Sequence, residues 1–206
     1  MKLLQSMGPN PRVVKIFITE LGLDIERHEV DLMAGENRQE AYQKLNPAGQ
    51  LPALQLDNGV VISEVTTICE YLEDINGPSD LIGSDAEQRA QTRMWTRRID
   101  LGFCEPMANG FRASEGRAIF ENRMKLVSPE ASGDLKALAQ NKLDWLDEQL
   151  QGKEFVCGER FSLADIMLYA FVEFGGAVGQ PLAPGHVNIK AWFDRVTARP
   201  SIAVSQ

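Results

Sequence analysis

Cysteine and histidine are scarce in this chain of 206 residues, which holds three cysteines and two histidines. The cysteines stand far apart, at Cys69, Cys104 and Cys157, without a C-x-x-C pair or the spacing of a metal site. An odd, scattered set of thiols is typical of a reducing compartment. The sequence therefore predicts neither a disulfide framework nor a metal centre.

Long apolar runs are also lacking. No stretch approaches the roughly 20 apolar residues that span a bilayer, and the N-terminus becomes polar too early for a secretory signal. Positive charge is in the minority, since 21 Lys and Arg stand against 29 Asp and Glu, for a net charge of −8. Nucleic-acid binding requires clustered cations on a surface. We therefore expect a cytoplasmic protein that binds neither membranes nor nucleic acids.

Strand and helix signals alternate in the first part of the chain. The expected elements are strands at 3–4, 25–32, 53–56 and 60–63, and helices at 13–23, 36–45 and 64–75. Asn58-Gly59, between the last two strands, is a strong hairpin signal because both residues tolerate positive φ. The order gives one parallel βαβ unit followed by an antiparallel pair. This predicts a thioredoxin-like α/β sheet with helices on both faces.

Strand signals end at the turn-rich segment 76–80. The helices expected beyond it lie at 86–101, 119–126, 135–150, 163–174 and 189–198. Ser162 and Asp165 fit a capping box at the start of the fourth of these helices, which is a structural feature. We predict two domains, an α/β domain over 1–78 and an all-helical domain over 86–206.

One stretch of the α/β part has the features of a binding site. Residues 46–54, NPAGQLPAL, hold two prolines and a glycine that force a tight, non-helical entry into a short strand. The hairpin that follows runs into Ser63-Glu64 and the start of a helix. Free backbone amides and a carboxylate thus come side by side, which suits a peptide-like ligand. A purely structural hairpin is the alternative.

Three motifs together resemble the cytosolic glutathione S-transferase superfamily over the whole chain. They are NPAGQLPAL at 46–54, Ser63-Glu64 leading into ICEYLE at 68–73, and FSLADI at 161–166. The resemblance implies the glutathione S-transferase fold, with a thioredoxin-like domain that binds glutathione as co-substrate and a C-terminal helical bundle that shapes the site of a small apolar electrophile. It also implies a homodimer.

The resemblance assigns roles to single residues of the glutathione site. Leu51 would pair its backbone with the cysteinyl part of glutathione, in the manner of an added strand, and Pro52 would follow a cis peptide bond. Gln50 would contact the glycyl end, and Glu64 would hold the γ-glutamyl amine. Val65 departs from the family, which usually has serine there. Its backbone amide can still donate to the γ-glutamyl carboxylate, but a hydroxyl contact is lost.

The catalytic position also departs from the family. Relatives activate the thiol with Tyr, Ser or Cys near the end of the first strand, and residues 5–12 offer only the hydroxyl of Ser6, too early in the loop. Asn10 is the candidate, because its side-chain NH₂ would donate to the thiolate. Followed by Pro11, Asn10 also fits a helix N-cap, and capping alone is the alternative. We expect Arg12 to be solvated.

Other polar and aromatic residues are weaker candidates. Asn37 and Arg38 lie where relatives contact the glycyl carboxylate, but their segment favours surface exposure. The aromatic and Met side chains of the helical part could line the electrophile pocket or pack in the core; these are Trp95, Phe103, Met107 and Phe111.

The sequence thus predicts a glutathione transferase that promotes thiolate attack on small electrophiles. A glutathione-dependent disulfide reductase or peroxidase is an alternative, since the Asn-bearing loop without Cys would permit it. A non-catalytic binding or scaffold protein that keeps the fold is a second alternative, because the usual hydroxyl groups are absent.

Overall fold

The computed structural model describes residues 1–205 and divides the chain into two compact units. The first unit holds residues 1–79 together with Val204 and Ser205, and the second holds residues 80–203. The end of the chain therefore belongs to the first unit, whereas the sequence placed it in the helical domain.

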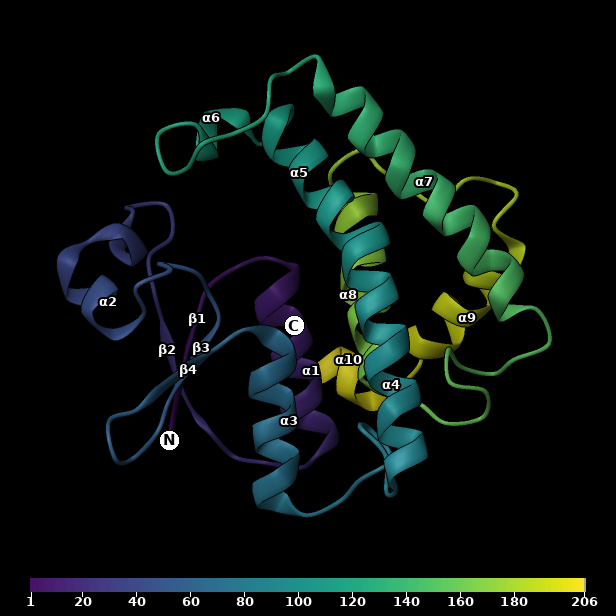
Figure 1. Cartoon of the computed structure of the whole chain (residues 1–206), viewed down its shortest axis with the longest axis horizontal. Coiled ribbons are helices and arrows are strands. Elements are labelled where there is room, and N and C mark those ends of the chain that lie inside the picture. Colours follow the sequence, from purple (N-terminus) through teal and green to yellow (C-terminus); the bar gives the residue numbers. More distant parts are fainter. Residues whose placement is uncertain (206) are drawn as a thin grey trace. The chain divides into compact units, whose positions relative to one another are not determined.

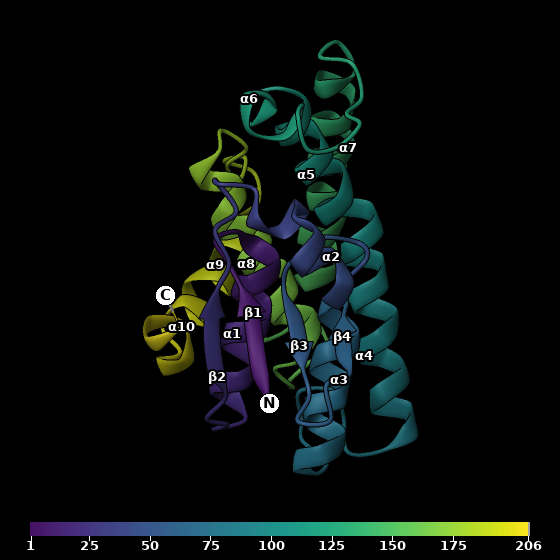
Figure 2. The same ribbon diagram turned by 90° about the vertical axis from the view of Figure 1, so that its left-hand side faces the viewer.

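A four-stranded mixed sheet forms the centre of the first unit (Figure 2), with the strand order β2-β1-β3-β4. The strands are β1 (Lys2–Gln5), β2 (Glu26–Glu29), β3 (Ala53–Gln55) and β4 (Val61–Ser63). The β1–β2 pair is parallel, and the other two pairs are antiparallel. This topology confirms the predicted thioredoxin-like sheet.

Helices cover both faces of this sheet (Figure 1), with α1 and α3 on one face and α2 on the other. The helices are α1 (Pro9–Glu20), the 3₁₀ turn η1 (Glu36–Arg38), α2 (Glu40–Leu45) and α3 (Val65–Asn76). The helix expected over 36–45 is broken at Gln39, whose extended backbone caps α2. Fully buried Phe17, Leu54 and Ile68 belong to the core that the apolar stripes of α1 and α3 predict.

The second unit is built from helices, of which α5 and α7 pack along each other (Figure 1). They are α4 (Ala86–Ile99), the π-helical turn η2 (Asp100–Cys104), α5 (Glu105–Ala113), α6 (Arg117–Phe120), α7 (Ala131–Leu150), α8 (Leu163–Ala177), α9 (Val187–Thr197) and α10 (Pro200–Val204), whose last residue is assigned to the first unit. No helix within residues 1–205 is both long and apolar enough to cross a bilayer.

Two helix predictions in this unit were wrong. The helix expected over 86–101 continues through η2 into α5. The turn between them is irregular because Pro106 has no N–H to donate to the carbonyl of Gly102 and would collide with that carbonyl in a regular α-helix. The wider π turn removes that conflict. The helix expected over 119–126 is reduced to α6, which buries no side chain, and a short helix without a buried face is marginal.

Asp165 ties the start of α8 to its neighbours. Its Oδ2 accepts hydrogen bonds from the backbone N and the hydroxyl of Ser162 at 3.0 and 2.9 Å. Its Oδ1 accepts from the backbone N of Val156 at 2.8 Å and from Nε1 of Trp192 at 2.9 Å. The predicted capping box is confirmed, and the same carboxylate also anchors α9 through Trp192.

Candidate functional site

The register of the sheet gathers the three predicted binding segments at one end of the sheet. Ala53, the first residue of β3, pairs with Leu4 of β1 on one side and with Ser63 of β4 on the other. The chain leaves β1 here toward the start of α1. Leu51 stands two residues before β3, and Glu64 directly follows β4. The loop before α1, the entry to β3 and the start of α3 are therefore neighbours.

Leu51 offers an unpaired stretch of backbone at this end. The Leu51–Pro52 peptide bond is cis, which confirms the sequence-based expectation. Neither the N–H nor the carbonyl of Leu51 forms a hydrogen bond within residues 1–205. An extended segment with free N–H and C=O groups can pair with the backbone of a peptide ligand.

The loop before Leu51 is held by three side chains that the sequence did not single out for this purpose. Asn37 Nδ2 donates to the carbonyl of Gly49 at 2.7 Å. The hydroxyl of Tyr42 and Nδ2 of Asn46 donate to the carbonyl of Gln50 at 2.8 and 2.9 Å. The side chain of Gln50 itself is exposed, so it is free to meet a ligand.

Position 49 requires glycine, because the backbone there passes close to Asn37 and Arg38. Its φ is +63°, and a Cβ there would lie 3.0 Å from both the carbonyl oxygen of Asn37 and Nη1 of Arg38. Asn37 is buried, so its expected surface exposure was wrong; its side chain is turned inward to bind the Gly49 carbonyl. Arg38 is half-buried, and its Nε has no partner within residues 1–205.

Glu64 stands at the N-cap of α3 in a backbone conformation that is rare for its type. Its φ is +72°, the one positive value at a non-glycine position within residues 1–205. Its carboxylate is exposed and does not cap the helix. Strained residues of this kind gather at ligand sites, so the backbone points to the same residue as the sequence motif.

The first turn of α3 presents donors beside Glu64. Ile68 N donates to the carbonyl of Glu64 at 2.9 Å, which is the first bond of the helix. The amides of Val65, Thr66 and Thr67 precede that bond and have no intrahelical partner. Together with the partial positive charge of a helix N-terminus, they form an anion site. Val65 contributes its amide alone.

Asn10 lies inside the first turn of α1 and is not its N-cap. The N-cap is Gly8, whose φ of +120° is open to glycine, and the helix then begins at Pro9. Glycine allows this early start, two residues ahead of the Pro11 start that the sequence suggested. The alternative that Asn10 only caps the helix is therefore wrong.

The two prolines leave Asn10 as the donor of this helix start. Pro9 and Pro11 have no N–H, and the N–H of Arg12 is already bonded to the carbonyl of Gly8 at 3.2 Å. Within residues 1–205, neither the amide nor the side chain of Asn10 has a hydrogen-bond partner. Both groups of Asn10 can therefore donate to an anion at the positive end of α1.

Arg12 is buried, so the expectation that it is solvated was wrong. Its Nη1 donates to the hydroxyl of Ser205 at 2.7 Å. The end of the chain thus holds the guanidinium at the first turn of α1, where its positive charge adds to that of the helix start.

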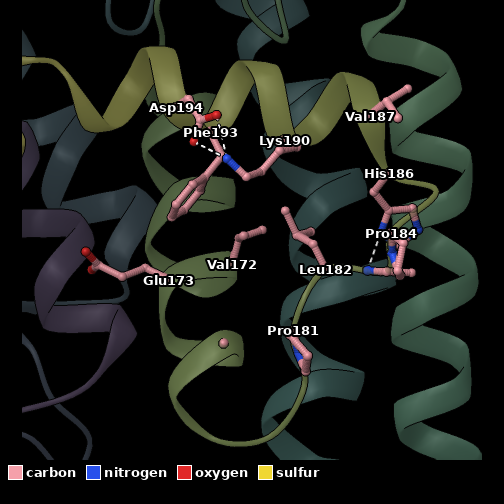
Figure 3. A pocket seen from close by; sticks show the side chains of 12 residues that line it. Val172, Glu173, Pro181, Leu182, Pro184, His186, Val187, Lys190, Phe193 and Asp194 are labelled. Carbon is pink, nitrogen blue, oxygen red and sulfur yellow. Dashed lines mark hydrogen bonds and ion pairs between the residues drawn. The ribbon is translucent and has the colours of Figure 1, made fainter.

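A pocket of about 640 Å³ lies within the second unit, between α8, α9 and the segment that joins them. Figure 3 shows Val172, Leu182 and Phe193 around it, with Lys190 turned to Asp194. The Lys190 ammonium contacts both carboxylate oxygens of Asp194, at 2.6 and 2.5 Å. The pocket contains none of the residues predicted for binding or catalysis.

Of the four side chains proposed for the electrophile pocket, two are buried and two are half-buried. Phe103 and Met107 are buried in the core of the second unit, which supports the packing alternative. Trp95 lies 5.7 Å from Trp145, centroid to centroid, and is half-buried. Phe111 meets Phe174 edge to face at 5.2 Å.

Comparisons with known proteins agree with this arrangement. Residues 7–75 match the family model of the glutathione S-transferase N-terminal domain, and residues 129–200 match that of the C-terminal domain. The first match contains Asn10, Leu51, Pro52 and Glu64.

Similar proteins cover nearly the whole chain. Protein LigF of Sphingobium sp. is 33% identical over an alignment of 236 positions that covers 97% of this chain and 90% of LigF. The crystal structure of Gtt2 from Saccharomyces cerevisiae has a TM-score of 0.93 at 25% identity and covers 100% of both chains. A glutathione S-transferase domain-containing protein from Marinobacter aquaeolei has a TM-score of 0.92 at 32% identity, over 98% of this chain and 100% of that one. With both family models matched and these relatives aligned from end to end, the chain belongs to the glutathione S-transferase family.

Proposed function

We propose that this protein is a glutathione transferase that binds glutathione at the sheet end and directs its thiolate at small electrophiles. The observation that carries the proposal is the register that sets Ala53 between Leu4 and Ser63. It brings an unpaired strand edge, a carboxylate and two helix N-termini together in one place. These are the groups that a γ-glutamyl tripeptide needs.

Each part of glutathione finds a chemical partner there. The Leu51 backbone pairs with the cysteinyl residue, as an added strand does. The γ-glutamyl carboxylate lies at the amides that open α3, and its ammonium meets Glu64. Gln50 and Arg38 face the glycyl carboxylate, for which Arg38 supplies the cation.

Thiolate formation is the step that the protein promotes. A free thiol has a pKa near ~8.5, and each unit by which that pKa is lowered requires about 1.4 kcal/mol of preferential interaction with the anion. Asn10 donates to the sulfur from a helix N-terminus, which favours the anion. The thiolate then attacks the electrophilic carbon and displaces its leaving group, and no further acid or base is needed.

Titration of bound glutathione tests the proposal directly. The ultraviolet absorbance of the thiolate is followed against pH, with the S-methyl derivative as the blank. We expect binding and a thiol pKa below that of free glutathione. A protein that does not bind glutathione would be the non-catalytic scaffold instead, and binding without a lower pKa would rule out thiolate activation.

Turnover then separates the possible electrophiles. A chlorinated nitroarene reports the transferase reaction, and a mixed disulfide reports the reductase alternative. A β-aryl ether is added because LigF carries the name beta-etherase in its crystal structure. The same thiolate attack would open such an ether, with the phenolate as leaving group.

The charge of Glu64 is expected to contribute to glutathione affinity. Glu64→Gln should raise the Kd about tenfold, since a hydrogen bond to a charged group is worth about 1.5–3 kcal/mol and the exposed site lies at the low end of that range. Calorimetric titration measures the change. A glutathione analogue without the α-amino group should bind both proteins equally, and a tenfold loss for this analogue too would contradict the assigned contact.

Val65→Ser is expected to strengthen glutathione binding about twofold to tenfold. The new hydroxyl at the first turn of α3 can donate to the γ-glutamyl carboxylate, and one added hydrogen bond contributes about 0.5–1.5 kcal/mol. Val65→Ala is the matched control, because it removes the methyl groups without adding a donor. Equal affinities for the Ser and Ala variants would place the carboxylate elsewhere.

A further inference from the structure

The peptide plane between Gln50 and Leu51 is fixed from one side. Its carbonyl accepts two hydrogen bonds, from Tyr42 at 2.8 Å and from Asn46 at 2.9 Å. The bond is trans, because the one cis peptide within residues 1–205 follows Leu51. In a trans peptide the carbonyl and the next N–H point to opposite sides. The Leu51 N–H therefore points away from Tyr42 and Asn46.

The two side chains that fix this peptide plane are well placed to hold it. Tyr42 and Asn46 are both buried, so water competes little for their donors. Burial also raises the pKa of the Tyr42 hydroxyl, which keeps its proton and stays a donor. The preceding peptide plane, between Gly49 and Gln50, is held as well, since Asn37 donates to the carbonyl of Gly49.

We propose that Tyr42 and Asn46 are positioning residues for glutathione, because they direct the Leu51 N–H toward the cysteinyl carbonyl of the ligand. The inference rests on the proposed function of the site. It adds that the strand edge is oriented before the ligand arrives. Neither side chain touches the thiol, so binding depends on them and the chemical step does not.

Two substitutions remove the two donors separately. Tyr42→Phe deletes the hydroxyl and keeps the ring in its apolar cluster with Leu4 and Val30, and Asn46→Ala deletes the amide. We expect each to raise the Kd and KM for glutathione about twofold to tenfold, with kcat at saturation unchanged. In the double variant the loss should exceed the product of the single losses, since either donor alone still holds the carbonyl.

Tyr71→Phe is the matched control. Tyr71 is a half-buried tyrosine of the same unit, and its hydroxyl has no partner within residues 1–205. Tyr71→Phe should leave the Kd for glutathione unchanged. In ¹⁵N-labelled protein, the amide signal of Leu51 should shift on addition of glutathione, and the shift should shrink in Tyr42→Phe and more so in the double variant.

The outcomes separate this inference from the function on which it rests. Wild-type protein that binds glutathione, with equal Kd values for Tyr42→Phe and the double variant, would overturn the inference and leave the function standing. A fall in kcat as large as the rise in KM would also overturn it. If the wild-type protein does not bind glutathione, both fail. If Asn46→Ala does not fold, Tyr42→Phe and its amide shift decide alone.

Discussion

Asn10→Ala is expected to lower kcat/KM about 10- to 100-fold near neutral pH and to raise the pKa of the bound thiol by about one to two units. The side chain donates to a sulfur that becomes charged, and a hydrogen bond to a charged group is worth about 1.5–3 kcal/mol. Asn10 has no other hydrogen-bond partner within residues 1–205, so little stability should be lost with it.

The pH–rate profile gives this prediction its signature. Below the thiol pKa, the rate follows the fraction of thiolate, which the wild-type protein makes larger. As pH rises above the pKa of the variant, both proteins hold the thiolate and the two rates should converge. A ratio of the two rates that stays constant with pH would show that Asn10 acts on something other than ionisation of the thiol.

Two further variants sharpen the assignment. Asn10→Asp places a carboxylate in the first turn of α1, which should stabilise the helix, but it repels the thiolate and should raise the thiol pKa above that of the Ala variant. A residue with a merely structural role would show the opposite order in activity. Ser6→Ala should leave the thiol pKa unchanged, and loss of the shift in that variant would move the activating group from Asn10 to Ser6.

Asp165→Ala is expected to lower the free energy of unfolding by about 3 kcal/mol or more. The substitution leaves three buried N–H donors without an acceptor, on Val156, Ser162 and Trp192. Each unsatisfied buried donor costs about 1–3 kcal/mol. Denaturant unfolding followed by tryptophan fluorescence measures the loss. Glu148→Ala, an exposed change near the end of α7, is the control and should stay within about 0.5 kcal/mol.

Asp165→Asn removes the ionisable group and keeps one of the two acceptor oxygens. Burial raises the pKa of Asp165 to about 6 and outweighs the hydrogen bonds that lower it. The folded protein then binds this proton more tightly than the unfolded chain, whose Asp pKa is near ~3.9. The stability contributed by this proton is complete below about pH 4 and is lost as pH rises through about 6. In Asp165→Asn that dependence should vanish, and an unchanged pH profile would contradict the shift.

Local sequence signals predicted most of the first unit because its elements are marked by turn residues. Asn58-Gly59 set the hairpin, and apolar spacing set α1 and α3. Helix boundaries were less predictable. The start of α1 depends on the positive φ of Gly8, and the continuation of α4 into α5 depends on how the turn before Pro106 widens. Both are backbone adjustments that residue type permits but does not dictate.

The binding site was predictable where the chain itself forms it, at Leu51, Pro52 and Glu64. The side chains that hold the loop were not, because Tyr42 and Asn46 act on a carbonyl through contacts that only the folded chain creates. A polar residue on the apolar side of a short helix, such as Tyr42 in α2, was the one available hint. Asn37 was considered for the ligand, and its observed partner is the protein backbone.

The backbone of Glu64 sets thermal stability against ligand recognition at a single residue. A non-glycine residue at φ +72° costs about 1–3 kcal/mol, which glycine would recover. Any selection for heat resistance alone would therefore enrich glycine at this position and remove the carboxylate assigned to the ligand's ammonium group. Retention of glutamate there under such selection would mean that binding, and not folding, keeps it.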